Sequence, residues 1–142
     1  MTKDTAKFLV KPYVLKVEKP WGYELILTNE NSKKITSKIL HVNSGKRISL
    51  QYHDNKEEAI TLISGSSILH IENGLGEVVK INMELNKGYL ILPFQIHRFE
   101  AITDSQLIES STAESGNTYR LEDDYSRGTE TDDDRNTSRK KA

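Results

Sequence analysis

Short apolar segments alternate with polar ones through the middle of the chain, and turn-forming residues separate them. The segments are four to seven residues long, rich in β-branched side chains, and cover residues 23–28, 36–42, 58–63, 67–71, 78–83, 89–92, 97–103 and 106–110. Many short strands at even spacing are typical of an antiparallel sandwich or a closed barrel. No stretch has the spacing of an amphipathic helix of ordinary length. The pattern predicts an all-β protein.

The two ends of the chain differ from this middle part. Residues 1–18 are expected to form an N-terminal arm, and residues 19–128 a single folded domain, which suits a chain of 142 residues. Residues 129–142, TETDDDRNTSRKKA, contain no large apolar side chain. A segment without apolar side chains buries too little to offset the entropy of ordering, so we expect a disordered tail.

Polar side chains begin some of the rows that should face the core. Glu58 and His97 each start a row of alternating, otherwise apolar residues, and Gln51 and His53 share one face of another extended segment. Burying a polar group without a partner costs about 1–3 kcal/mol. A shared metal ion would satisfy all of these groups at once.

This ligand set favours a divalent metal ion. One amide oxygen, two imidazoles and one carboxylate suit Zn, Mn, Fe, Co or Ni, and the absence of cysteine excludes a thiolate site. We expect one such ion with four ligands, Gln51, His53, Glu58 and His97. The remaining histidines, His41 and His70, alternate with apolar neighbours and are expected to face solvent.

Composition excludes several partners. The net charge of -1 gives no general attraction to nucleic acid or to an anionic membrane. No apolar run approaches the roughly 20 residues that cross a bilayer. The apolar residues 8–10 are followed at once by Lys11 and Pro12, unlike the core of a signal peptide. We therefore expect a cytoplasmic protein with no nucleic-acid or membrane partner.

Two motifs resemble those of the cupin superfamily. The segment from Gly45 to Gly65 resembles the first cupin motif, with Gln51 in place of its first histidine, and PFQIHRFEA at 93–101 resembles the second. This resemblance implies a small double-stranded β-helix, also described as a cupin or jelly-roll barrel. It also supports Gln51, His53, Glu58 and His97 as the metal ligands.

More narrowly, the chain resembles the cupin domain of type II mannose-6-phosphate isomerases, which is often fused to mannose-1-phosphate guanylyltransferases. The lead-in KPWGYE at 19–24, the first motif RISLQYH at 47–53 and the ending RLEDDYSR at 120–127 occur in the order of that family. One departure is Ser126, which stands where the family commonly has glycine.

The resemblance implies a metal-dependent aldose–ketose isomerase that acts on a sugar phosphate, specifically on mannose 6-phosphate and fructose 6-phosphate. Arg127 matches the family's terminal arginine and is the first candidate for a catalytic role, followed by Arg120. Lys38 shares the inward face of its strand and is expected either to stabilise a developing oxyanion or to act as a base with a lowered pKa. Arg47 and Arg98 are expected to bind the phosphate.

Two other functions stay open. A non-catalytic module that holds metal or sugar fits the loop at 54–57, which lacks the additional histidine and arginine common in the isomerases. Oxygen chemistry on iron is the less favoured alternative, because the glutamine ligand and the RLEDDYSR ending count against it. We also expect a homodimer, because small cupin sheets leave uncovered edges and residues 8–17 alternate like an extra strand.

Overall fold

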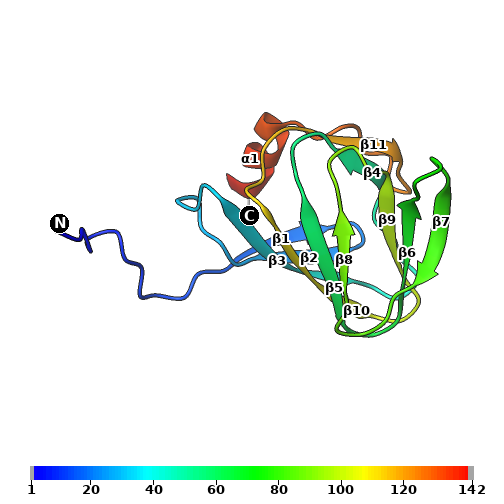
Figure 1. Cartoon of the computed structure of the whole chain (residues 1–142), viewed down its shortest axis with the longest axis horizontal. Coiled ribbons are helices and arrows are strands. Elements are labelled where there is room, and N and C mark those ends of the chain that lie inside the picture. Colours follow the sequence, from blue (N-terminus) through cyan, green and yellow to red (C-terminus); the bar gives the residue numbers. More distant parts are fainter. Residues whose placement is uncertain (1, 141–142) are drawn as a thin grey trace.

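The computed structural model describes residues 2–140, which form two antiparallel sheets and one helix (Figure 1). The strands are β1 Leu15–Lys19, β2 Gly22–Ile26, β3 Ile35–Val42, β4 Leu50–His53, β5 Glu58–Ser64, β6 Ser67–Glu72, β7 Val78–Asn82, β8 Gly88–Ile91, β9 His97–Ala101, β10 Ser105–Thr112 and β11 Thr118–Glu122. One sheet has the order β1-β2-β3-β10-β5-β8 and the other the order β11-β4-β9-β6-β7. The all-β, cupin-type fold that the sequence predicts is confirmed.

Alternation along the strands builds the core between the sheets. The inward rows of β3 and β5 supply Leu40, Val42, Ile60 and Leu62, each at most 4% exposed. Facing rows of the other sheet contribute Leu69 and Phe99, which are direct neighbours across the β6–β9 pair. The same inward rows continue into Lys38, Glu58 and His97, so polar side chains enter one end of the core.

Each of the eight predicted segments is a strand, and three further strands complete the sheets. β1 lies within the predicted arm, and β4 and β11 are short strands with little apolar alternation. Gly22 lets β2 approach β3 closely, because its φ is 152° and an added Cβ would lie 1.9 Å from the carbonyl oxygen of His41. This close pairing places the preceding Trp21 in the core, 4% exposed.

The predicted disordered tail is replaced by structure over residues 129–140; residues 141 and 142 lie outside the described part. Thr131 caps the helix α1 Asp132–Lys140, since its hydroxyl accepts from Asp134 N at 3.2 Å and its own N–H donates to the Asp134 carboxylate at 3.0 Å. Three aspartates in the first turn and two basic residues in the last complement the helix dipole.

Ionic contacts rather than apolar packing attach α1 to the sheets. Arg135 is 7% exposed and donates to Gly116 O at 3.0 Å, to Glu130 at 3.2 Å and to Asp132 at 2.6 Å. The prediction of disorder weighed only apolar burial, and this segment is held by a buried arginine instead.

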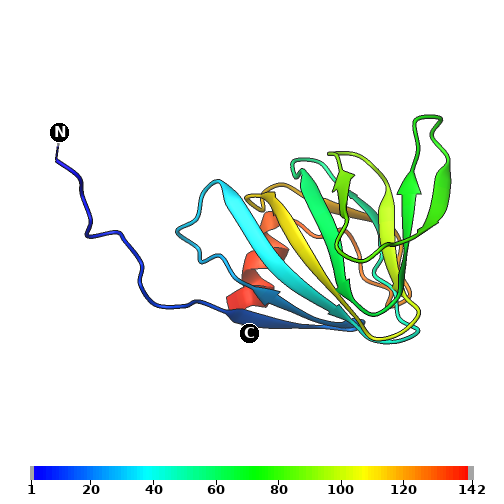
Figure 2. The ribbon, with the colours of Figure 1, turned by 60° about the horizontal axis from the view of Figure 1, so that its bottom comes forward.

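Residues 2–14 extend away from the two sheets (Figures 1 and 2). Phe8, Leu9, Val10 and Val14 are each at least half exposed on this arm. Along residues 2–140, no helix has the length and apolar character that crossing a membrane requires.

Candidate metal centre and cavity

Three strands bring the candidate ligands together at one end of the core. His53 ends β4, Glu58 begins β5 and His97 begins β9, and each offers one ligand atom within 4.8 Å of the others. Gln51 lies directly opposite His97 in the β4–β9 pair, with its amide nitrogen 3.5 Å from His53 Nε2. The structure thus brings His53, Glu58 and His97 together and places the Gln51 amide beside His53.

Each of the two histidines turns one ring nitrogen toward the Glu58 carboxylate. His97 Nδ1 donates to Gln95 O at 2.9 Å, and its Nε2 lies 3.3 Å from Glu58 Oε1 without a hydrogen bond. His53 Nδ1 contacts the Thr118 hydroxyl at 2.9 Å, and its Nε2 is 3.8 Å from the same Oε1. Burial, reinforced by the nearby charge of Lys56, lowers the pKa of His53 to about 2, so its imidazole is neutral.

These buried electron-rich atoms fit a divalent cation. His97 Nε2 is buried without a hydrogen bond 3.3 Å from the Glu58 carboxylate, and a cation held between these two atoms would bind both. The Gln51 side-chain oxygen accepts from the Ser49 hydroxyl at 2.6 Å; rotating the amide by half a turn would aim this oxygen at His53 and let Ser49 accept from the nitrogen. Three or four such ligands leave coordination positions open for oxygen atoms of a substrate.

A cavity of about 70 Å³ adjoins the cluster and is lined by Gln51, His53 and Glu58 among others. Seven lysine or arginine side chains and five glutamates line it within the described residues. The lining is therefore net positive even before a metal charge is added, and it favours an anionic ligand.

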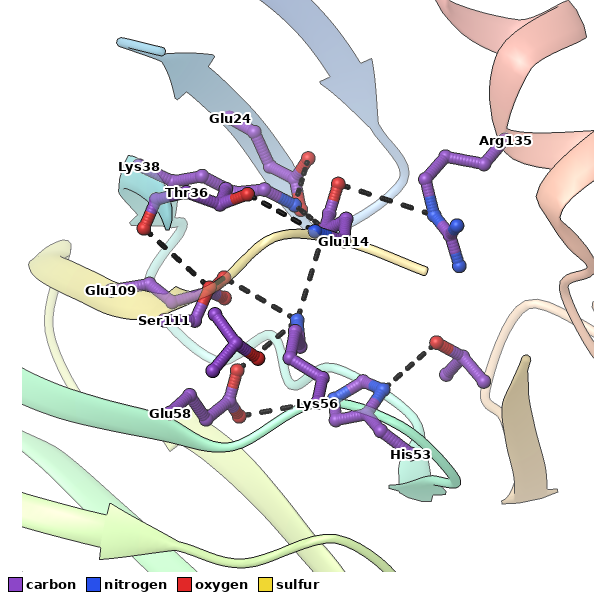
Figure 3. A network of polar contacts seen from close by, with 12 residues as sticks. Glu24, Thr36, Lys38, His53, Lys56, Glu58, Glu109, Ser111, Glu114 and Arg135 are labelled. Carbon is purple, nitrogen blue, oxygen red and sulfur yellow. Dashed lines mark hydrogen bonds and ion pairs between the residues drawn. The ribbon is translucent and has the colours of Figure 1, made fainter. Parts of the chain in front are cut away.

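Lys56 occupies the centre of this polar network and was not predicted (Figure 3). Its Nζ is 3.1 Å from Glu58, 3.3 Å from Glu109 and 3.7 Å from Glu114. Burial alone would lower the pKa of Lys56, but Glu109 and Glu58 outweigh it and raise that pKa. Alternation could have found Lys56, because residue 56 continues the inward row of residues 58, 60 and 62. It was missed because a lysine in a turn is normally expected to face solvent.

Glu109 is the other buried group next to Lys56. Burial raises the pKa of Glu109 to about 7, although Lys56 pulls it down. Its carboxylate also accepts from the Ser111 hydroxyl at 3.1 Å. Glu109 can therefore exist in both protonation states near neutral pH.

Lys38 lines the same cavity as a stable cation. Burial lowers its pKa, but Glu114 and Glu24 outweigh burial and raise it overall. Lys38 contacts Glu114 and lies 3.5 Å from Glu24. Of the two roles expected for Lys38, stabilisation of negative charge fits this environment and a base with a lowered pKa does not.

Arg120 and Arg127 also line the cavity. Arg127 donates from Nε to Asp123 at 2.9 Å, and Arg120 donates to Gly128 O at 2.6 Å while its Nε is buried without a partner. Ser126 has a φ of 57°, in the left-handed region that favours glycine, so the turn keeps the backbone that the family builds with glycine.

Arg47 and Arg98 lie away from the cavity, so the predicted phosphate role does not fit them. Arg47 pairs with Asp124 at the surface, with its Nε 2.7 Å from the carboxylate. Arg47 precedes β4 and is not part of a regular strand, so alternation along β4 does not predict the direction of its side chain. Arg98 faces away from the core, opposite to its neighbour His97, and donates to Ile48 O at 2.9 Å.

His70 is 7% exposed, so the expectation that it faces solvent is wrong. It lies opposite Arg98 on the outer side of the second sheet, with Nε2 3.1 Å from Glu100. Alternation alone reports the side of the sheet on which His70 lies and not how deeply its imidazole is buried there.

Two antiparallel sheets around a buried His–Glu–His cluster define a cupin domain with a candidate metal centre. The sequence profile described as mannose-6-phosphate isomerase C-terminal matches residues 10–130. The chain belongs to this family. No curated protein sequence matches it.

Solved cupin structures share the fold at low identity. KdgF from Halomonas sp. superposes with a TM-score of 0.57 and 13% identity over 68% of this chain and 83% of that one. Bacillus subtilis oxalate decarboxylase, in a structure concerned with its Mn(II) centres, gives a TM-score of 0.65 and 16% identity, over 76% of this chain and 30% of that one. The Staphylococcus aureus capsular polysaccharide assembling protein CapF gives a TM-score of 0.55 and 12% identity, over 90% of this chain and 34% of that one. The chain spans only about a third of the last two proteins, and these likenesses concern the fold.

Proposed function

We propose that the protein is a metal-dependent aldose–ketose isomerase that interconverts mannose 6-phosphate and fructose 6-phosphate. The observation that carries the proposal is a single cavity in which a candidate metal centre adjoins a titratable carboxyl group and an excess of cationic side chains. Membership of the family supports the same substrate class.

His53, Glu58 and His97, with Gln51, would hold the metal ion. A bound divalent ion would act as a Lewis acid toward the substrate's carbonyl and neighbouring hydroxyl oxygens. The protein's own part is to keep His53 and Glu58 deprotonated and to fix the ligands on three hydrogen-bonded strands.

Isomerisation moves a proton between C1 and C2, which requires a group that takes the proton and returns it. Glu109 is our candidate, because a pKa of about 7 balances the two protonation states near neutral pH. Lys56, 3.3 Å from Glu109 and 3.1 Å from Glu58, stays charged and keeps both carboxylates in place.

Arg127 and Arg120 would bind the phosphate group. Guanidinium groups recognise phosphate through two parallel hydrogen bonds, and both side chains line the cavity. Lys38 adds a fixed positive charge on the opposite sheet.

Turnover of mannose 6-phosphate by metal-loaded protein tests the proposal. Glu109→Gln should lower kcat by about 100-fold or more, the usual contribution of a general base, while metal content stays unchanged. The matched control is Glu84→Gln, which changes an exposed glutamate. Metal-loaded wild type that converts neither mannose 6-phosphate nor fructose 6-phosphate would contradict the proposal.

The second candidate is a non-catalytic module that binds metal or a sugar phosphate. The small volume of the cavity, about 70 Å³, and the ion pairs that fill its surroundings favour it. Binding of mannose 6-phosphate without turnover would select this candidate.

A further inference from the structure

One carboxylate of the cavity lies among four cationic side chains. Glu114, on the loop between β10 and β11, contacts Lys38 and lies 3.7 Å from Lys56 and 4.0 Å from Arg135 (Figure 3). It also contacts Arg139 of α1. Burial alone would raise the pKa of Glu114, but Lys38, Lys56 and Arg139 outweigh it and hold that pKa well below its usual range. Lys38, Lys56 and Arg135 have further carboxylate partners, whereas Arg139 pairs with Glu114 alone within residues 2–140.

Two of these cations belong to α1, which follows the last residue matched by the family profile, residue 130. Arg135 holds α1 in place through Gly116, Glu130 and Asp132. Arg139 differs, because its only ion pair within residues 2–140 is with Glu114, and a quarter of its side chain remains exposed. Arg139 is therefore available to exchange one anion for another.

The cavity must open before it can admit a sugar phosphate. Its volume of about 70 Å³ corresponds to roughly five water molecules at about 10–15 Å³ each. Ser138 and Arg139 of α1 form part of the lining. Because α1 carries no apolar side chain between Asp132 and Lys140, moving it away exposes no apolar side chain of its own.

From these observations, and resting on the proposed function, we propose that α1 closes over the substrate and that Arg139 binds its phosphate in place of the Glu114 carboxylate. A phosphate dianion carries more charge than a carboxylate and offers a guanidinium two oxygens. It would therefore pair with the Arg139 guanidinium more strongly than the Glu114 carboxylate does. In this arrangement Glu114 occupies the anion position only while the substrate is absent.

Calorimetric titration of metal-loaded protein with mannose 6-phosphate, inorganic phosphate and mannose tests the inference. Arg139→Ala should weaken binding of mannose 6-phosphate and of inorganic phosphate by about tenfold or more, as expected for a lost charge-assisted contact, and should leave mannose unaffected. The matched control Lys140→Ala removes the same charge from an exposed neighbour on α1 and should change none of the three.

A second variant makes the competition explicit. Glu114→Gln removes the internal anion, so it should tighten binding of inorganic phosphate, provided that circular dichroism shows an intact fold. Unchanged phosphate affinity in Arg139→Ala, or weaker affinity in folded Glu114→Gln, would overturn the inference.

The two proposals fail separately. Arg139-dependent binding of mannose 6-phosphate without turnover would reject the isomerase and keep the phosphate contact. Turnover whose KM is unaffected by Arg139→Ala would keep the isomerase and reject the contact. Absence of binding for both phosphate compounds would reject the contact as well.

Discussion

The base and the mouth of the cavity are built in different ways. At the base, His53, Glu58 and His97 lie on strands whose backbones are held by ladder hydrogen bonds. At the mouth, Glu114 lies on a loop and Arg139 on a short helix, and side-chain ion pairs hold them together. Strands fix the base, which suits side chains that must keep the geometry of metal ligands. The Arg139–Glu114 ion pair at the mouth is partly exposed, so Arg139 can exchange Glu114 for another anion.

Charge follows the same division. The base presents two imidazoles and one carboxylate as candidate metal ligands, whereas the mouth carries more lysine and arginine than glutamate. Lys56 stands between the two regions and contacts carboxylates of both, Glu58 and Glu114. Changes to Lys56 should therefore affect the whole cavity, and changes further from it should affect one region alone.

The largest expected effect follows removal of Lys56. Lys56→Ala leaves Glu58 and Glu109 buried without their shared partner, and breaking a buried ion pair costs about 3–5 kcal/mol. Urea unfolding of the metal-free protein measures this loss. Lys46→Ala, at an exposed lysine, is the control and should unfold as the wild type does. A loss as small as that of the control would show that the network contributes little to folding.

Metal removal should have the next largest effect and should act on the base alone. A ligand that binds only the native state stabilises it by about 2.7 kcal/mol at 100 times its Kd. Chelation should therefore lower the Tm of the wild type but not that of Glu58→Ala, which lacks a ligand. Glu57→Ala, an exposed neighbour, should respond like the wild type. Equal responses of wild type and Glu58→Ala would remove Glu58 from the metal centre.

Arg127→Ala should reduce turnover by about tenfold, or about 1.4 kcal/mol of transition-state stabilisation, with metal content intact. The chain offers a matched arginine–aspartate pair away from the cavity, because Arg47 contacts Asp124 as Arg127 contacts Asp123. Arg47→Ala should leave turnover unchanged. Steady-state kinetics on mannose 6-phosphate compares the two, and equal effects would assign Arg127 a structural role.

The base of the cavity was largely predictable from the sequence and the mouth was not. Glu58 and His97 continue apolar rows of regular strands, so alternation reports their direction. Lys56 lies in a turn, where alternation is not normally applied. α1 has no apolar stripe, and its order depends on Arg135 reaching carboxylates and a carbonyl that are distant in sequence. Long-range ionic contacts leave no periodic signal, which explains why the helix was missed.

Acid should loosen the mouth while the protein stays folded. The pKa of Glu114 is lowered in the folded state, so its contribution to stability is present above the unfolded pKa and is lost as the pH falls through the folded value. Arg139 and Arg135 then lose the Glu114 carboxylate, so α1 is the element that should loosen. Amide hydrogen exchange of α1, measured from about pH 7 downward, should become faster relative to that of β3 once the intrinsic pH dependence is subtracted. Glu114→Gln should exchange fast throughout, and a wild-type ratio that is independent of pH would contradict the assignment.

The smallest effect on the cavity should follow loss of the N-terminal arm, which contacts neither region. Phe8, Leu9, Val10 and Val14 are exposed although they are apolar, and β1 leaves a sheet edge uncovered within the described residues. We expect the arm to pair with the sheet of a second copy and to produce a homodimer. Light scattering should give a dimer for the full chain and a monomer after deletion of residues 2–13, with metal content unchanged in both. The control replaces the exposed Leu75, on the distant β6–β7 turn, by serine and should remain dimeric. A full chain that is monomeric at micromolar concentration would exclude this pairing.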